Sequence, residues 1–479
     1  MILGKKQLKQ LTLASLPFAD AASKGLPLGQ LLRLSLFQVS VGMASVLLLG
    51  TLNRVMIVEL SVSATVVALM IALPVLAAPF RTILGFRSDT YRSALGWKRV
   101  PYLWFGSLWQ MGGLAIMPFS LIVLGGDQYL GPTWAGEVLA AMAFLMTGVG
   151  LHMTQTAGLA LASDRADDDT RPRVVALLYV MLLLGMGISS IIVGWLLRDF
   201  SDLRLIRVVQ SCAIATLVLN LLALWKQEKL RPMSAQERAA PRPSFQTAWR
   251  TLMANSKIGR LMAVVAAGSF GFSMQDVLLE PYGGEILGLS VATTTLLTAM
   301  WAVGALAGFG LAARWLAQGM DVFRMAARGL LIGVAAFSAV IFANPMGSDA
   351  LFFAGACTIG LGNGLFSVST LTAAMGMPSE GLAGRGLTLG AWGAAQASAA
   401  GLATVVGGTL RDVVGHWAVS GSAGQGLATP AIGYTFVYHI EIAFLFITLI
   451  LLGPLVRTKI LGATRDEGAA RIGLADFPT

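Results

Sequence analysis

Five residues that can exchange a proton stand inside long apolar stretches of this sequence. They are His152, Asp276, Glu280, His439 and Glu441. Ionisable side chains are costly to bury in such stretches, so each is a candidate for a functional site. Carboxylates can carry protons, and a neutral imidazole can ligate a metal ion held in a macrocycle. The chemistry open to these residues is therefore proton coupling or ligation.

Spacing indicates which of these residues can act together. Asp276 and Glu280 are four residues apart, so on a helix they project from one face. They would either carry protons in coupled transport or pair with helix-end donors and arginines. His439 and Glu441 are two residues apart and face different directions on a helix, which disfavours a shared metal site. Further charged candidates lie nearer to the ends of the apolar stretches: Arg54, Glu59 and Glu285.

Composition places the chain in a membrane. Hydrophobic residues make up 56% of the 479 residues and charged residues 12%, and the mean hydropathy is +0.74. So few polar residues are not enough for the surface of a soluble protein. The formal charge of +10 is typical of cytoplasmic loops rich in Lys and Arg that contact anionic lipids. It requires no nucleic-acid partner.

Twelve apolar stretches have the length and composition of membrane-spanning helices, for which roughly 20 residues are needed. They are residues 34–58, 62–84, 101–124, 134–162, 174–197, 206–225, 259–287, 291–316, 328–344, 350–376, 386–410 and 434–456. These stretches predict an all-α, polytopic membrane protein with about twelve transmembrane helices.

The distribution of basic residues predicts the orientation of these helices. Loops that remain in the cytoplasm keep an excess of Lys and Arg. If the N-terminus is cytoplasmic, few of the 34 basic residues face the far side, namely Arg54, Arg198, Arg204, Arg207 and Arg411. We therefore expect a multi-pass protein of a bacterial inner membrane with both termini in the cytoplasm.

Two sequence landmarks recur in the two halves of the chain. Leu-Ser-Val opens the second span at 60–62 and the eighth at 289–291, and Leu-Arg-Asp ends the fifth at 197–199 and the eleventh at 410–412. Because each half holds six spans, both run in the same direction, as in the parallel repeats of the major facilitator superfamily. The predicted organisation is an interfacial segment 1–33, a six-helix bundle 34–225, a polar linker 226–257, a second bundle 258–456 and a cytoplasmic tail 457–479.

The loop between the second and third spans has the pattern of a charge-paired gate. Gly85 is followed by Asp89 and then by basic residues that include Arg92 and Arg99. Such a loop can hold two helix ends together in one conformation and release them in another. The counterpart in the second half, residues 308–328, has no Asp at the matching place. A solvated basic loop is therefore the alternative interpretation.

No segment has the spacing of an enzyme active site. The sequence has neither a nucleotide-binding glycine loop after a strand nor a nucleophile elbow. Its 2 cysteines lie in apolar stretches without a CxxC pattern, and its 55 glycines are typical of close helix packing in lipid. We expect no catalysis and no metal site built by the protein alone.

Longer motifs resemble one family. They are residues 16–22 (LPFADAA), 52–60 (LNRVMIVEL), 85–89 (GFRSD) with 96–102 (GWKRVPY), and 278–284 (LLEPYGG). Together they are similar to the PucC family, the bacteriochlorophyll-delivery branch of the major facilitator superfamily. The resemblance covers both halves of the chain.

This resemblance implies an antenna-assembly protein in the intracytoplasmic photosynthetic membrane of purple bacteria. It implies binding or delivery of bacteriochlorophyll, or chaperoning of antenna polypeptides. The partners would be antenna polypeptides, the reaction-centre core complex, pigment-synthesis enzymes and membrane lipids. The long N-terminal segment favours the core antenna as the client. Two alternatives stay open: a proton-coupled transporter of a small solute, and a pigment-free chaperone for antenna helices.

A bound tetrapyrrole would need an apolar slot, a magnesium ligand and a donor for its ring carbonyls. His152 is the first candidate for the ligand, because the glycines beside it let a flat molecule approach closely. The alternative for His152 is a hydrogen-bonded core histidine, and His439 is the second candidate ligand. Gly185 and Gly187 are small residues on which an antenna helix could pack.

Overall fold

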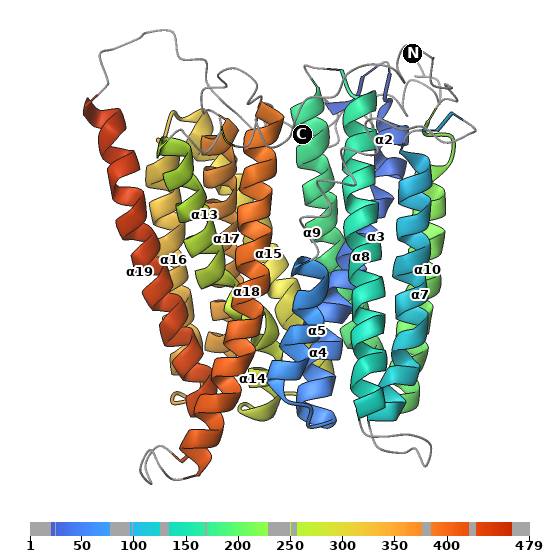
Figure 1. The fold of residues 1–479 in the computed structure, drawn as a ribbon, viewed down its shortest axis with the longest axis vertical. Helices are drawn as coiled ribbons and strands as arrows, with labels where there is room; N and C mark the ends of the chain where they lie inside the picture. The colour runs from blue at the N-terminus through green and yellow to red at the C-terminus, as the bar shows by residue number, and fades with distance from the viewer. Residues whose placement is uncertain are drawn as a thin grey trace, which may run out of the picture.

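A computed structural model describes residues 21–23, 25–76, 96–97, 99–124, 134–167, 170–228, 250, 256–375, 385–420 and 428–461. These residues are almost entirely helical and include no β-strand (Figure 1). The predicted all-α class is therefore confirmed.

The first half of the chain forms helical rods that lie together on one side of the molecule (Figure 1). The first rod is built from α2 (Leu28–Leu34), α3 (Leu36–Ser45), η2 (Val46–Thr51), α4 (Leu52–Arg54) and η3 (Val55–Glu59). The remaining rods are α5 (Ala64–Leu76), α7 (Val100–Leu124), α8 (Trp134–Arg165), α9 (Arg171–Leu196) and α10 (Asp202–Leu224).

The second half repeats this arrangement on the other side. Its first rod is α13 (Ser256–Ser273), η4 (Met274–Val277) and α14 (Leu279–Glu285). It is followed by α15 (Val291–Ala317), α16 (Val322–Ala343), α17 (Asp349–Met375), α18 (Arg385–Val419) and α19 (Ala431–Leu461).

Each predicted span falls on one of these rods. Within the described residues, 10 helices are long and apolar enough to cross a membrane, and α5 is a shorter apolar helix. The remaining rod, α18, is rich in Gly and Ala and carries Arg411 and Asp412 near its end. The first rod begins at Leu28 instead of residue 34, because α2 buries Leu28, Leu31 and Leu34.

The first and seventh rods are both irregular, and they contact each other there. The first passes through two π-helical segments, η2 and η3, and the seventh through the 3₁₀ segment η4. Asn53 donates one hydrogen bond to the Leu49 carbonyl at 3.0 Å and another to the Val277 carbonyl at 3.0 Å. The Asn53 amide thus satisfies backbone groups of both halves where regular helix pairing is interrupted.

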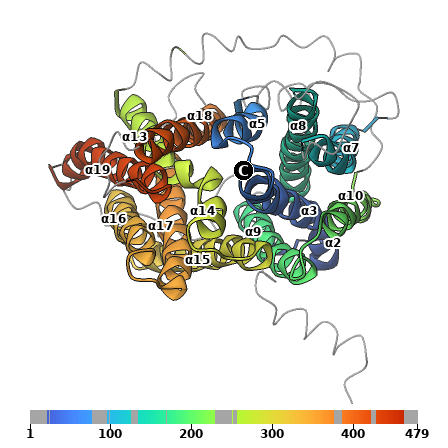
Figure 2. The ribbon, with the colours of Figure 1, turned by 90° about the horizontal axis from the view of Figure 1, so that it is seen from below.

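Two helix pairs make the most extensive contacts between the halves: α9 with α15, and α5 with α18 (Figure 2). A Cβ atom on Gly194 of α9 would lie 2.9 Å from the Ala292 carbonyl oxygen of α15. A Cβ atom on Gly408 of α18 would lie 2.6 Å from the Ala64 carbonyl oxygen at α5. Both glycines therefore permit backbone approaches that a larger residue would block.

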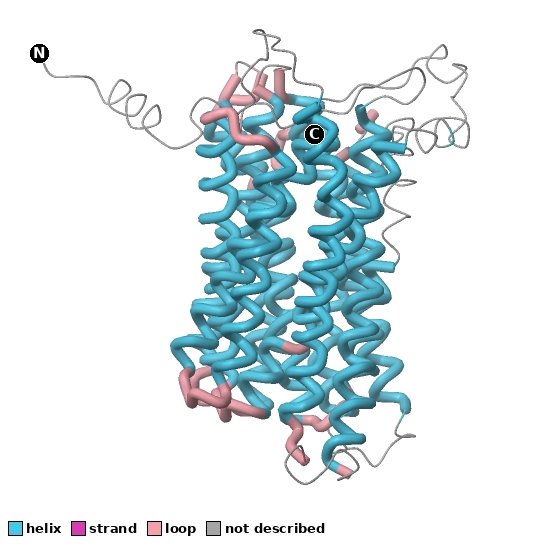
Figure 3. Tube along the Cα trace, turned by 90° about the vertical axis from the view of Figure 1, so that its left-hand side faces the viewer, coloured by secondary structure: helices cyan, strands magenta, loops and turns pink. Residues whose placement is uncertain are grey.

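All rods run along the length of the molecule, which gives it two ends (Figure 3). We call the end where α2 begins and α19 finishes the near end, at the top of Figure 1, and the opposite end the far end. The near end corresponds to the side that we expect to face the cytoplasm. This orientation stays a prediction, and so do the boundaries given above for the two bundles.

Candidate functional site

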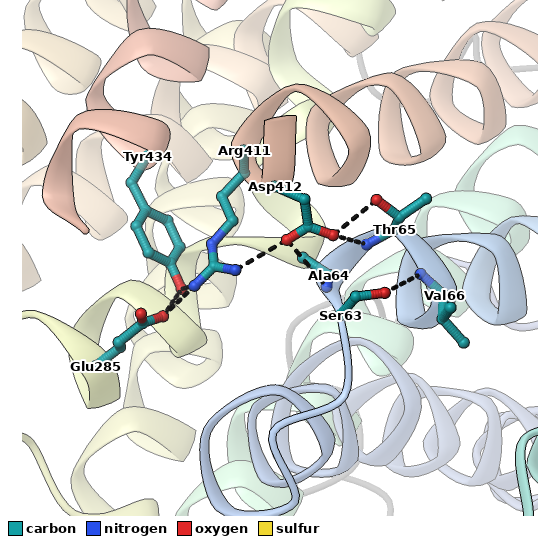
Figure 4. Close-up of polar contacts among 8 residues, drawn as sticks. All are labelled: Ser63, Ala64, Thr65, Val66, Glu285, Arg411, Asp412 and Tyr434. Atoms are coloured by element: carbon teal, nitrogen blue, oxygen red, sulfur yellow. Dashed lines mark hydrogen bonds and ion pairs between the residues drawn. The ribbon is translucent and has the colours of Figure 1, made fainter. Parts of the chain in front are cut away.

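Asp412 of α18 joins the two halves at the far end (Figure 4). Its carboxylate accepts hydrogen bonds from the backbone N–H of Ala64 at 3.3 Å and of Thr65 at 2.7 Å, and from the Thr65 hydroxyl at 2.7 Å. The first N–H groups of a helix lack partners within that helix. Asp412 therefore caps α5 from the opposite half.

Arg411 positions this carboxylate. It donates to Asp412 at 2.8 Å, to the Tyr434 hydroxyl at 3.1 Å and to Glu285, and its guanidinium lies 4.7 Å from the centre of the Tyr434 ring. The Tyr434 hydroxyl in turn donates to Glu285 at 2.6 Å. We call these residues, with Thr65, the latch (Figure 4). The latch ties α5 to α14, α18 and α19.

Arg54 makes a second connection at the far end. Its side chain is buried, forms an ion pair with Glu59 and donates to the Leu289 carbonyl at 3.1 Å. Leu289 lies two residues before the start of α15 in the second half. Arg54 and Glu59, which sequence marks as candidates, therefore contribute to the far-end contact between the halves.

The two carboxylates of the seventh rod, the half-buried Asp276 and the buried Glu280, have separate surroundings. Glu280 is 4% exposed, accepts from the Thr298 hydroxyl at 2.7 Å and lies against Gly50 of the opposite half. Asp276 accepts from the Gln275 amide at 2.5 Å, beside Glu441. The 3₁₀ segment η4 interrupts the helical register between them. Asp276 and Glu280 therefore belong to different segments of the seventh rod, η4 and α14, and their joint action stays a prediction.

Glu441 is fully buried in α19. Its carboxylate accepts the backbone N–H of Gln275 at 2.7 Å, in the first turn of η4. Glu441 thereby satisfies a donor that the helix break exposes. Through this hydrogen bond to Gln275, Glu441 is tied to the seventh rod at the residue that precedes Asp276.

An apolar cavity of about 390 Å³ lies between the halves, toward the near end of α9. This volume falls in the range of roughly 300–1,000 Å³ that is typical of small-molecule sites. Four helices, α9, α15, α17 and α18, build its wall. Its bulky and polar lining residues include Tyr179, Trp301, Phe309, Asn363, Ser367, Trp392 and Gln396. We call it the inter-half cavity.

Hydrogen bonds fix part of this lining. The Trp392 indole N–H donates to the Thr370 hydroxyl at 3.2 Å, and the Ser367 hydroxyl donates to the Asn363 side-chain oxygen at 3.3 Å. The Trp301 indole N–H is buried and has no acceptor among the described residues. The cavity thus has aromatic walls that are partly held by hydrogen bonds, while the indole nitrogen of Trp301 is buried away from the open space.

The two candidate pigment-binding histidines lie outside the lining of this cavity. His152 is half-buried on α8. His439 is exposed on α19, with its Nδ1 atom 2.7 Å from the Thr435 carbonyl oxygen. Among the described residues, no group of three or more His, Cys, Asp or Glu side chains could hold a metal ion. The ligand assignments to both histidines stay predictions.

The predicted gate loop is described only at its end. Gly85, Asp89 and Arg92 lie outside the described residues. Arg99 is 4% exposed, and its Nε atom lies 2.9 Å from a carboxylate oxygen of Asp164 on α8. In the structure, Arg99 therefore anchors the start of α7 within the first half.

One expectation about partner docking is wrong. Gly185 is buried, and a Cβ atom there would lie 2.7 Å from the Val39 Cα atom of α3. It serves helix packing inside the first half and cannot seat a partner helix. Gly187 has no atom within 4 Å of such a Cβ position and faces outward, beside the exposed Ile188.

Sequence reasoning missed the lining of the inter-half cavity and most of the latch. Trp301 and Trp392 carry no ionisable group, so a search for charges within spans passes over them. Arg411 and Asp412 stood out only as part of the Leu-Arg-Asp landmark. That landmark was a usable signal, because a paired Arg and Asp inside a span need partners.

Known proteins resemble the chain in sequence. The model of the family described as PUCC protein matches residues 51–460. A protein of Rhodobacter capsulatus, named "Uncharacterized protein in puhA-bchM intergenic region", is 65% identical over 100% of both chains. Protein PucC of Rhodovulum sulfidophilum is 52% identical, over 83% of this chain and 88% of its own length.

Solved structures resemble the chain in fold. A bacterial homologue of the human lysosomal transporter Spinster, in an inward-facing and unoccupied conformation, matches with a TM-score of 0.68 and 15% identity over 90% of this chain and 97% of that one. The nucleoside transporter NupG matches with a TM-score of 0.65 and 12% identity over 89% and 99%. The predicted fold of the major facilitator superfamily is confirmed. By its sequence, the chain belongs to the PUCC protein family.

Proposed function

We propose that this protein is an assembly factor for photosynthetic antenna complexes and that it holds bacteriochlorophyll in the inter-half cavity. Membership of the PUCC family implies a role in antenna assembly. The observation that carries the pigment proposal is the cavity between α9, α15, α17 and α18, which is apolar and aromatic.

The lining suits a tetrapyrrole in three respects. Trp301, Phe309 and Trp392 offer aromatic surfaces to a flat conjugated ring. The side-chain NH₂ group of Gln396 can donate to a ring carbonyl. The side-chain amides of Asn363 and Gln396 offer oxygen atoms, the ligand type that magnesium prefers. Bacteriochlorophyll enters this account as cargo, so the protein needs no resident cofactor.

The far-end contacts support a route through the near end. The latch and the Arg54 contacts close the interface at the far end. The inter-half cavity lies on the other side of these contacts, beside the near-end halves of α9 and α18. Pigment would therefore enter and leave near the predicted cytoplasmic side, where pigment-synthesis enzymes and nascent antenna polypeptides are expected as partners.

Holding and handing over a pigment changes no covalent bond, so the proposal requires no catalytic residue. The antenna client would be the core antenna around the reaction centre, in the intracytoplasmic membrane. The N-terminal segment is the feature that favours this client over the peripheral antenna.

A proton-coupled transporter of a small solute is the second candidate function. The buried Glu280 and Glu441 and the half-buried Asp276 favour it, because intramembrane carboxylates are typical proton carriers. Glu280 also lies where the halves meet, against Gly50. A transporter of this kind would purify without pigment, which separates it from the first proposal.

Absorption spectroscopy of the purified full-length protein tests the pigment proposal. Trp301→Ala and Trp392→Ala are expected to lower the near-infrared absorbance per protein, because each removes an aromatic wall of the cavity. Trp109→Ala is the matched control, since Trp109 is 47% exposed on the outer face of α7. Equal pigment in all three variants would contradict the cavity assignment.

Identification of the polypeptides that purify with the protein distinguishes the two alternative functions, the helix chaperone and the solute transporter. A colourless preparation that retains antenna polypeptides would favour the pigment-free helix chaperone. A colourless preparation without antenna polypeptides would favour the solute transporter.

A further inference from the structure

A second pocket, distinct from the inter-half cavity and the latch, lies at the far-end tips of α9 and α10. It has a volume of about 350 Å³. Its lining is formed by Trp195, Leu196, Arg198, Asp199, Arg204, Arg207, Val208 and Ser211. We call it the arginine pocket.

The arginine pocket carries more positive than negative charge. Asp199 lies 2.9 Å from Arg204 and 3.7 Å from Arg198, so one carboxylate is shared between two guanidinium groups. Arg207 is exposed and has no ion pair among the described residues. Three arginines against one aspartate leave a formal excess of two positive charges in the lining.

The concentration of arginines here runs against the charge bias of the whole chain. The basic residues expected on the far side are Arg54, Arg198, Arg204, Arg207 and Arg411. Arg54 and Arg411 are engaged in ion pairs at the interface of the halves. All the others line this one pocket. The positive-inside rule gives no reason for such a cluster, so a local ligand is the more direct explanation.

The surroundings place the pocket at the edge of the hydrocarbon layer. The outward face of α9 exposes Ile188, Ile191 and Ile192, each by more than half, and ends with Trp195 at 63% exposure. The apolar stretch of α9 that is long enough to span a membrane ends at Leu196, two residues before Arg198. The Arg198 guanidinium lies 5.5 Å from the centre of the Trp195 ring. An apolar face that ends in Trp and Arg is typical of the membrane interface.

We propose that the arginine pocket binds the phosphate group of an anionic phospholipid in the far leaflet. Guanidinium groups match phosphate oxygens with paired hydrogen bonds, and the excess charge of the lining complements the anion. Trp195 and Leu196 lie where the glycerol and upper acyl chain of such a lipid would run. The bound lipid would hold α9, a helix that also lines the inter-half cavity.

Native mass spectrometry of the detergent-solubilised full-length protein tests this site, with phosphatidylglycerol as the probe and phosphatidylcholine as the neutral comparison. Arg207→Gln is the first variant, since it breaks no ion pair. We expect it to weaken phosphatidylglycerol binding about tenfold, the loss typical of one charge-assisted hydrogen bond. A variant with Arg198, Arg204 and Arg207 all changed to Gln should lose the preference for phosphatidylglycerol.

Arg328→Gln is the matched control, because Arg328 is an exposed arginine at the near end that lies 5.0 Å from the centre of the Trp315 ring. It should bind phosphatidylglycerol like the parent protein. Equal binding of phosphatidylglycerol and phosphatidylcholine by the parent protein would overturn the proposal. A preference for phosphatidylglycerol that survives the triple substitution would also overturn it. So would displacement of the lipid by an equal concentration of a helical peptide with acidic residues at one end, because the pocket would then bind a protein partner in preference to a lipid.

Discussion

Removal of the Asp412 carboxylate is expected to open the far end of the molecule. Asp412→Ala deletes the acceptor for the Ala64 and Thr65 N–H groups and for the Thr65 hydroxyl. It also leaves the Arg411 guanidinium without one of its partners. These contacts join α18 to α5 across the two halves, so their loss weakens the closed arrangement specifically.

The magnitude follows from the type of contact that is lost. Loss of a helix N-cap costs about 0.5–2 kcal/mol, which shifts a two-state equilibrium by about 2- to 30-fold. Asp412→Asn keeps one side-chain oxygen as an acceptor but loses the charge. The opened population in Asp412→Asn should therefore be larger than in the parent protein and smaller than in Asp412→Ala.

Electron–electron double resonance between two spin labels measures this opening. Val138 on α8 and Val413 on α18 are suitable label sites, because they are 48% and 62% exposed and belong to opposite halves. The native Cys212 and Cys357 would first be replaced. We expect Asp412→Ala to add or enlarge a population with a longer distance between the labels.

A matched cap within one half provides the control. Asp321 accepts the backbone N–H groups of Phe323 at 2.9 Å and Arg324 at 3.1 Å at the start of α16. Asp321→Ala loses a cap of the same type without touching the interface of the halves. An unchanged distance distribution in Asp412→Ala, or an equal shift in Asp321→Ala, would refute the reasoning.

Three further predictions concern packing, charge and ligation. Gly408→Val should lower the thermal unfolding temperature, because overpacking of a tight contact typically costs about 1–3 kcal/mol. Gly453→Val is the control and should leave this temperature unchanged, since no atom lies within 4 Å of its Cβ position. The hydrogen bond from Arg204 lowers the pKa of Asp199. Any extra stability of the parent protein over Asp199→Asn is therefore present above a pH of about 4 and is lost as the pH falls and the carboxylate takes up a proton. Because His152 lies outside the lining of the inter-half cavity, His152→Ala should lower pigment absorbance per protein only if a pigment is ligated on α8 as well, with membrane insertion unchanged.

Each of these predictions has a contrary outcome. Equal unfolding temperatures for the two valine variants would mean that α18 and α5 can separate at no cost. A stability difference for Asp199→Asn that grows toward low pH would have the wrong sign for a carboxylate whose pKa is lowered. Unchanged pigment in His152→Ala would exclude His152 as the ligand and leave His439, Asn363 and Gln396 as candidates.

The spans were predictable because bilayer thickness demands a minimum apolar length, which leaves a strong signal in one dimension. The break in the seventh rod was not predictable from that signal. Segment η4 is stabilised by the Asn53 contact with the Val277 carbonyl and by the Glu441 contact with the Gln275 N–H. Both partners are far away in the sequence, so the sequence around Asp276 and Glu280 alone does not reveal that a helix break separates them.

The candidate sites differ in how far the sequence reveals them. Charge inside a span marks Arg54, Glu59 and Glu280, and the structure places all three at or near the contact between the halves. The inter-half cavity leaves no such mark. Trp301 and Trp392 come from helices far apart in the sequence, and only the packing of α15 and α18 on α9 brings their side chains to one cavity.

Whether the inter-half cavity holds bacteriochlorophyll is decided by the near-infrared absorption spectrum of the gently solubilised, affinity-purified protein. We expect bacteriochlorophyll in stoichiometric amount in the parent protein and in Trp109→Ala, and a clear loss in Trp301→Ala and Trp392→Ala. A parent protein that purifies without pigment, or pigment that is retained in both cavity variants, would contradict this expectation.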